Sequence, residues 1–192
     1  MLAEDGRCKT LDETADGYVR GDACGLMLLS KEDLEDKSFS TSSEPQIVSV
    51  AVNQDGRSSS LTAPSGVAQQ QVLSEAMTKA NLLPAEILFT EMHGTGTPLG
   101  DPIEVNALMT VYRKSRNLIA DPLNLTSVKS RIGHTEAAAG ISGLFQLLGG
   151  AVLQRSISFG HLTSVNPYVA PALKQNSIPR EERPLNKSSA SK

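Results

Sequence analysis

Strand-like and helix-like segments alternate along most of the chain. Apolar runs at residues 46–53, 87–92 and 123–128 are typical of strands. A stretch with helical spacing of apolar residues follows each of them, and Ser65 is well placed to cap the first of these helices. Such alternation predicts an α/β fold built around a layered sheet.

Three further segments can be assigned from composition. Residues 24–29 form a short apolar run, which is typical of a buried strand. Residues 38–45 are rich in Ser and Thr and predict an exposed loop. Residues 187–192 are polar and predict a frayed tail.

The helix that follows residues 87–92 has a well-marked start. Asp101 can act as its N-cap, and Pro102 suits the first turn. Glu104 lies three residues after Asp101, which is the spacing of a capping box. We therefore expect Asp101 and Glu104 to cap this helix.

Charge and composition exclude several classes of protein. The chain has 18 Lys and Arg against 21 Asp and Glu, so its net charge is −3 and nucleic acid is not an expected partner. Two cysteines in 192 residues cannot form a disulfide framework and favour a reduced, cytoplasmic protein. Residues 137–154 carry no charge, but seven Gly, Ser and Gln residues make the run weakly apolar. We expect a buried helix of a soluble core there, and no membrane span.

Two of the predicted strands end beside a histidine. His93 directly follows residues 87–92, while residues 123–128 are followed by Lys129 and then, five residues later, by His134. Ligands of open α/β sheets bind beyond the carboxyl ends of the strands. Two neutral imidazoles and a lysine gathered there could stabilise an enolate or an oxyanion.

The loop after His93 is rich in glycine, which allows the backbone to approach a ligand closely. Thr95 and Thr97 add hydroxyls that can donate to an amide or a phosphate. Spacing alone leaves ordinary roles open, because strand-end histidines and lysines are often surface or core groups. No G-x-x-x-x-G-K-[ST] string occurs, and the three histidines lack the close spacing of metal ligands, so neither a phosphate-binding loop of that class nor a metal site is expected.

The two cysteines carry no sign of catalysis. Neither Cys8 nor Cys24 has a histidine beside it or lies in a nucleophile-elbow string. We expect both to be ordinary thiols.

Two strings carry a resemblance to a known family. Residues 91–104 read E-M-H-G-T-G-T-P-L-G-D-P-I-E, and residues 127–140 read S-V-K-S-R-I-G-H-T-E-A-A-A-G. They resemble the two histidine motifs of β-ketoacyl synthases, above all the ketosynthase domains of type I polyketide and fatty acid synthases. Three further strings agree with the family in the same order, at residues 16–21, 52–57 and 61–66.

The resemblance extends over roughly residues 4–185 and implies a thiolase-like fold of two βαβαβ-type halves. It assigns residues 1–45 to the end of the N-terminal half and residues 46–185 to the C-terminal half, and leaves residues 186–192 as a polar tail. The implied reaction is decarboxylative Claisen condensation of an acyl thioester with a malonyl-type extender on acyl carrier protein.

The resemblance also implies roles for single residues. His93 and His134 would be the paired histidines that promote decarboxylation and stabilise the enolate, with Lys129 supporting them. Thr95 and Thr97 would hold the phosphopantetheine arm, which acyl carrier protein delivers, so no bound cofactor is expected.

The same resemblance makes Asp101 and Glu104 an acidic frame for the His93 loop. The expected partners are acyl carrier protein and either the remaining ketosynthase half or a second copy in a homodimer.

Several features depart from the family pattern. The nucleophilic cysteine of the family lies in a D-T-A-C-S-S type string, and neither this string nor G-F-G-G-T-N occurs in the 192 residues. Arg131 stands where the family has Asn, and Asp22 where Glu is usual. The chain is therefore predicted to be a ketosynthase fragment that is inactive alone, or else a noncatalytic half-domain that associates with a complete synthase.

Overall fold

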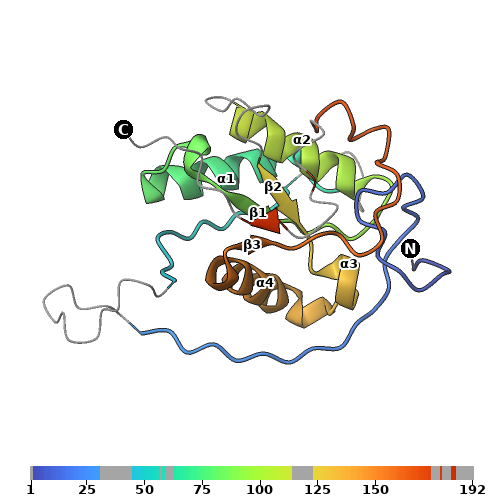
Figure 1. The fold of residues 1–192 in the computed structure, drawn as a ribbon. Coiled ribbons are helices and arrows are strands. Elements are labelled where there is room, and N and C mark those ends of the chain that lie inside the picture. The colour runs from blue at the N-terminus through green and yellow to red at the C-terminus, as the bar shows by residue number, and fades with distance from the viewer. Residues whose placement is uncertain are drawn as a thin grey trace, which may run out of the picture.

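Two short parallel strands with helices on both sides form the centre of the molecule in a computed structural model (Figure 1). The structure describes residues 2–30, 45–56, 58, 63–113, 123–173, 178 and 183–184. The predicted loop lies outside the described residues except for residue 45, and the predicted tail lies wholly outside them.

The central strands are β1 (Phe89–Glu91) and β2 (Asn124–Thr126), as the apolar runs predicted. They pair in parallel, with Phe89 opposite Asn124 and Glu91 opposite Thr126. Because the strands are direct neighbours, the loops at their carboxyl ends meet at one edge of the sheet, where we expected His93, Lys129 and His134 to gather.

Helices α1 (Gly66–Ala80) and α2 (Gly100–Tyr112) pack against each other on one side of this sheet, and α4 (Ala139–Leu153) lies on the other (Figure 1). Ser65 caps α1 as predicted, since its hydroxyl accepts a hydrogen bond from the Ala68 amide at 3.2 Å. The apolar side chains of α2 and the central strands form the core, together with residues that include Leu11, Phe159 and Val169.

Short elements connect these layers. They are η1 (Pro84–Glu86), α3 (Lys129–Ile132), η3 (Glu136–Ala138), β3 (Arg155–Ser156) and β4 (Arg183–Pro184). Strands β3 and β4 pair antiparallel and form a second small sheet.

Helix α4 is less buried than its composition predicted. Its face toward the sheet is made of small residues, with Gly150 close to the Phe89 ring and Gly143 close to Glu91. Elsewhere on the helix Phe145 is 41% exposed and Val152 is 70% exposed. The expectation of a buried helix is therefore wrong for the described chain, in which α4 has a neighbour on only part of its surface.

The segment Glu136–Leu153 has a mean hydropathy of 1.4, and 11% of it is buried. By length and composition it could cross a membrane, and it is the single segment of the described chain that could. Core helices of soluble proteins pass the same test, so this is weak evidence for a span.

Two predicted strands are absent from the described chain. Residues 24–29 are extended without ladder partners, and Leu26 and Leu28 are 93% and 96% exposed. Gly25 contacts the Phe145 ring of α4, so this segment is covered on one side only. The prediction of a buried strand is wrong because no second layer covers its outer side in the described structure.

Residues 46–53 also run extended without forming a strand. Instead, they lie along the surface of α1. The Ser49 hydroxyl donates to the Ala76 carbonyl at 2.8 Å, and the Asn53 side-chain amide donates to the Ala68 carbonyl at 2.7 Å. Side-chain contacts with a helix thus hold the segment in place without a sheet ladder.

Candidate active site

The loop after β1 is held by a buried carboxylate from α2. Glu104 accepts hydrogen bonds from the His93 amide at 2.6 Å and from the Gly94 amide at 2.9 Å. Burial raises the pKa of Glu104 to about 7, although these hydrogen bonds oppose the shift. Glu104 therefore fixes the backbone that carries the first histidine.

Asp101 acts in the same way on the next part of the loop. Its carboxylate accepts from the Gly96 amide at 3.1 Å and from the Leu11 amide at 2.8 Å, and burial raises its pKa. Helix α2 begins at Gly100 with Leu99 as its N-cap. The prediction that Asp101 and Glu104 cap α2 is wrong: they form the acidic frame of the loop, as the family resemblance implied.

Glycine is required within this loop. Gly94 has φ = 47° and Gly96 has φ = 79°, in the left-handed region that side chains disfavour. A Cβ at Gly94 would come within 2.8 Å of Thr10 and Ser127. The hydroxyls of Thr10 and Ser127 both donate to the Gly94 carbonyl, at 2.6 and 3.1 Å, so the loop is clamped from two sides.

The second histidine follows the short helix α3. The chain turns at Gly133, which has φ = 78°. The His134 amide donates to the Val19 carbonyl at 2.7 Å, and the Gly21 amide donates to the His134 carbonyl at 2.9 Å. The N-terminal segment thus pairs with the backbone of His134 and holds it at the carboxyl edge of the sheet.

The two histidine rings meet, as their places in the sequence predicted. Their centroids are 5.5 Å apart and their planes are inclined by 86°, an edge-to-face arrangement. The His134 ring also contacts the Tyr18 ring, and the centroids of these two rings are 5.1 Å apart. Two imidazoles 41 residues apart in sequence are therefore brought into one site.

The hydrogen bonds of His134 assign its tautomer. The Glu136 amide donates to His134 Nδ1 at 2.9 Å, so Nδ1 carries no proton and the neutral ring holds its proton on Nε2. Desolvation and the nearby Lys129 cation lower the pKa of His134. The neutral ring is thereby favoured at physiological pH, with Nε2–H as a hydrogen-bond donor.

His93 is shifted in the same direction. Desolvation, then the Lys129 cation and then His134 lower the pKa of His93 to about 4, although the residue as a whole keeps contact with solvent. At neutral pH both rings are uncharged. Neutral imidazoles donate hydrogen bonds to a developing oxyanion without adding a further positive charge.

Lys129 is buried at the start of α3, with 4% of its surface exposed. Burial lowers the pKa of its ammonium, while the nearby Glu91, Glu104 and Cys8 oppose that shift. The predicted position of a lysine near the histidines agrees with this geometry. Lys129 lies in a short helix, however, and not at the end of a strand.

The two loop threonines differ in their surroundings. Thr95 is 7% exposed, and Thr97 accepts a hydrogen bond from the Gly100 amide at 3.1 Å through its hydroxyl. The Thr97 hydroxyl keeps its own proton available for donation. Their role in binding an arm stays a prediction.

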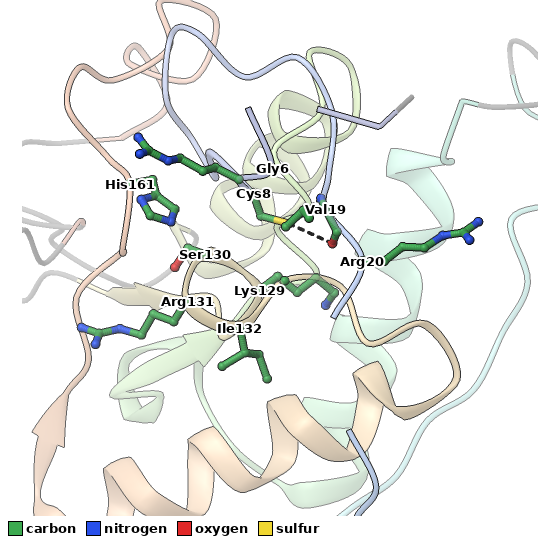
Figure 2. A pocket seen from close by; sticks show the side chains of 11 residues that line it. Gly6, Cys8, Val19, Arg20, Lys129, Ser130, Arg131, Ile132 and His161 are labelled. Carbon is green, nitrogen blue, oxygen red and sulfur yellow. Dashed lines mark hydrogen bonds between the residues drawn. The ribbon is translucent and has the colours of Figure 1, made fainter. Parts of the chain in front are cut away.

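A hollow of about 270 Å³ adjoins the site (Figure 2). Lys129, Ser130 and His161 line it, with Cys8 and Val19 across from them, and the Lys129 side chain extends toward the segment of Val19 (Figure 2). Neither His93 nor His134 is among its lining residues. The hollow is therefore not a pocket that the two rings share.

The cysteines lie apart from each other. Cys8 is 1% exposed and its thiol is enclosed by Val19, whose amide donates to Sγ at 3.3 Å. Burial raises the pKa of the Cys8 thiol, which disfavours the thiolate that a nucleophile requires. Cys24 is exposed.

Arg131 is bound to Ser158. It is exposed, and its guanidinium donates to the Ser158 carbonyl at 3.0 Å and to the Ser158 hydroxyl at 2.9 Å. The nearby acid Glu136 forms an ion pair with Arg20 at 3.0 Å. The Arg131 side chain therefore lies at the surface, bound to Ser158.

Glu91 is a residue of the site to which the sequence assigned no role. It is the last residue of β1, and its carboxylate accepts from the Thr126 hydroxyl and the Val128 amide, both at 2.6 Å. An acid at the end of an otherwise apolar strand, two residues before His93, was the signal available in the sequence. No group of three metal-binding side chains occurs among the residues that the structure describes.

Family profiles match both parts of the chain. The beta-ketoacyl synthase C-terminal domain matches residues 45–154, and the beta-ketoacyl synthase N-terminal domain matches residues 1–35. Among curated proteins, the chain is 44% identical over 170 residues to a component of the phenolphthiocerol/phthiocerol polyketide synthase of Mycobacterium tuberculosis, covering 85% of this chain and 7% of that protein. It is 50% identical over 149 residues to the polyketide synthase GfsA of Streptomyces halstedii, covering 76% of this chain and 2% of that protein.

Solved structures show the same likeness. The ketosynthase from module 6 of the bacillaene synthase of Bacillus subtilis is 30% identical, with a TM-score of 0.79 over 98% of this chain and 33% of that one. An oxazolomycin ketosynthase domain of Streptomyces albus is 28% identical, with a TM-score of 0.76 over 96% of this chain and 31% of that one. The expected thiolase-like fold is confirmed, and the chain spans about a third of these ketosynthase structures.

Proposed function

Because the chain belongs to the β-ketoacyl synthase family, we propose that it forms part of a ketosynthase, an acyltransferase that joins an acyl thioester to a malonyl-type extender. The reaction is a decarboxylative Claisen condensation on acyl carrier protein. The observation that carries the proposal is the pair of neutral imidazoles, 5.5 Å apart between ring centroids, at the carboxyl edge of two parallel strands.

In this proposal His93 and His134 act on the extender. Loss of CO₂ from a malonyl thioester leaves its electron pair on the thioester as an enolate, whose oxygen becomes negative. The Nε2–H of His134 is oriented by the Glu136 amide on the opposite ring nitrogen, so it can donate to that oxygen. His93 supplies the second donor from a loop that Glu104 holds.

Lys129 serves the two histidines through its charge. A cation beside them keeps both rings neutral, which preserves them as donors with no net charge. Thr95 and Thr97 hold the phosphopantetheine arm that acyl carrier protein delivers. The chain itself binds no cofactor in this account.

The acyl group needs a nucleophile from elsewhere. The 192 residues contain no D-T-A-C-S-S string, and Cys8 is a buried thiol with a raised pKa. The expected partners are therefore acyl carrier protein and a ketosynthase half that carries the cysteine, or a homodimer partner. We expect such an assembly in the cytoplasm.

A second function follows from the same features. The chain could act as a noncatalytic half-domain that associates with a complete synthase. The extended and exposed residues 24–29 favour association of some kind, because Leu26 and Leu28 leave apolar surface open to solvent.

Reconstitution separates the two functions. The chain would be fused behind the N-terminal domain of a related ketosynthase that carries the cysteine string, and ketoacyl product would be measured from acyl and malonyl thioesters. If the chain is part of an enzyme, the fusion forms ketoacyl product. His93→Ala or His134→Ala should then lower the rate of product formation by at least about 100-fold, which is the usual effect of losing a hydrogen-bond donor to an oxyanion. His161→Ala, outside the contact between the two rings, is the matched control, and absence of product in a folded fusion would favour the noncatalytic half-domain.

A further inference from the structure

Glu91 joins three elements at the edge of the sheet. It ends β1 and lies opposite Thr126 in β2. One carboxylate oxygen accepts from the Thr126 hydroxyl and the other from the Val128 amide, each at 2.6 Å. Both oxygens therefore hold the piece of chain that immediately precedes Lys129.

Helix α4 fixes the same carboxylate from the other side. A Cβ added to Gly143 would lie 3.2 Å from Glu91 Cγ, so a larger residue there would make the Glu91 side chain shift by a few tenths of an ångström. The Gln146 side chain also lowers the pKa of the Glu91 carboxyl, against the effect of burial. Glu91 thus has one well-defined position between β2, α3 and α4.

The negative charge of Glu91 affects the buried ammonium of Lys129. Lys129 is 4% exposed, and no ion pair within 4.0 Å joins it to any part of the chain that the structure describes. The groups that face Lys129 come from several elements. They are Glu91 of β1, Glu104 of α2, Cys8 of the N-terminal segment, and His93 and His134.

We propose that Glu91 is a positioning residue, which fixes the turn that carries Lys129 and places a carboxylate close to this buried cation and the two histidines. Among the groups that oppose the effect of burial on Lys129, Glu91 contributes most. The contribution of Glu91 to condensation rests on the proposed function. The electrostatic coupling between Glu91 and Lys129 is independent of that function, so it can be measured on the 192-residue chain alone.

The test uses Glu91→Gln, which keeps the shape and one acceptor of the side chain and removes its charge. Lysine side chains would be labelled with ¹³C and titrated by NMR, and the Lys129 signal would be assigned by its loss in Lys129→Met. The titration midpoint of Lys129 should move to lower pH in Glu91→Gln. A merely structural role of Glu91 would leave this midpoint unchanged in a folded variant, and that result would overturn the proposal.

Two glycines of α4 provide a matched pair of controls. Gly143→Ala presses a methyl group against Glu91 and should also move the Lys129 midpoint, whereas Gly149→Ala meets nothing within 4 Å and should leave it unchanged.

If Glu91→Gln does not fold, the coupling can be tested from the other residue, by titrating Glu91 in Lys129→Met. The carboxyl signal of Glu91 should then titrate at higher pH in Lys129→Met than in the wild type, and an unchanged midpoint would refute the coupling.

Discussion

The imidazole rings of His93 and His134 meet edge to face, with centroids 5.5 Å apart. Each ring follows one of two adjacent parallel strands, and each is held through its backbone by a different part of the chain. The pairing of β1 with β2 thus brings the two segments to one edge of the sheet, and the contacts of Glu104 and of residues 19–21 hold the two histidines there.

Removal of the Lys129 charge should raise the pKa of both histidines. The cation lowers the pKa of His93 and of His134, so Lys129→Met makes protonation of each ring easier. His93 should titrate clearly above its value of about 4. Histidine NMR titration measures both shifts, and Lys79→Met on the exposed side of α1 should change neither.

The buried Glu104 should make stability depend on pH in a recognisable way. Its pKa is raised from 4.5 to about 7 on folding, so its contribution is complete below pH 4.5 and is lost as pH rises through 7. The free energy of unfolding of the wild type relative to Glu104→Gln should thus fall by up to about 3 kcal/mol over this range.

Urea unfolding at several pH values measures that difference. Thr110→Ala, an exposed substitution on α2 that removes no titratable group, is the matched control and should show a flat profile. A difference that grows with pH for Glu104→Gln would contradict the assigned direction of the shift.

Replacement of Arg131 should not harm condensation. Its guanidinium is exposed and bound to Ser158, outside the contact between the histidines. In the reconstituted synthase Arg131→Asn, which restores the residue usual in the family, should preserve or raise the rate. A loss beyond about tenfold would show that Arg131 takes part in the reaction or in holding the site.

Exposed leucines should govern the solubility of the isolated chain. Leu26 and Leu28 are 93% and 96% exposed, so changing both to Ser removes apolar surface without opening the core. The double variant should aggregate less in light scattering and retain the wild-type free energy of unfolding. Unchanged aggregation would place the association surface elsewhere, for example on the exposed residues of α4.

The residues of the central strands could be predicted because their signals are local. Apolar runs at β1 and β2 and the Ser65 cap depend on neighbours in sequence. The predicted adjacency of His93 and His134 followed from a general rule on the carboxyl ends of parallel strands. These features needed no knowledge of distant contacts.

Other features depended on contacts that sequence spacing does not reveal. Asp101 and Glu104 have the spacing of a capping box, yet the unpaired amides of the His93 loop compete for the same carboxylates and bind them. Residues 24–29 have the composition of a buried strand, but burial requires a second layer that the described structure does not contain. Glu91 was overlooked because its partners lie 35 and 37 residues away.

The central claim is that this chain supplies the paired histidines and not the nucleophile. Incubation of the purified chain with acyl and malonyl thioesters, followed by intact-protein mass measurement and product analysis, tests it most directly. We predict no acyl adduct and no β-ketoacyl product, with slow decarboxylation of the malonyl thioester as the most that could remain. An acyl adduct on Cys8 or Cys24 accompanied by ketoacyl product would contradict the account.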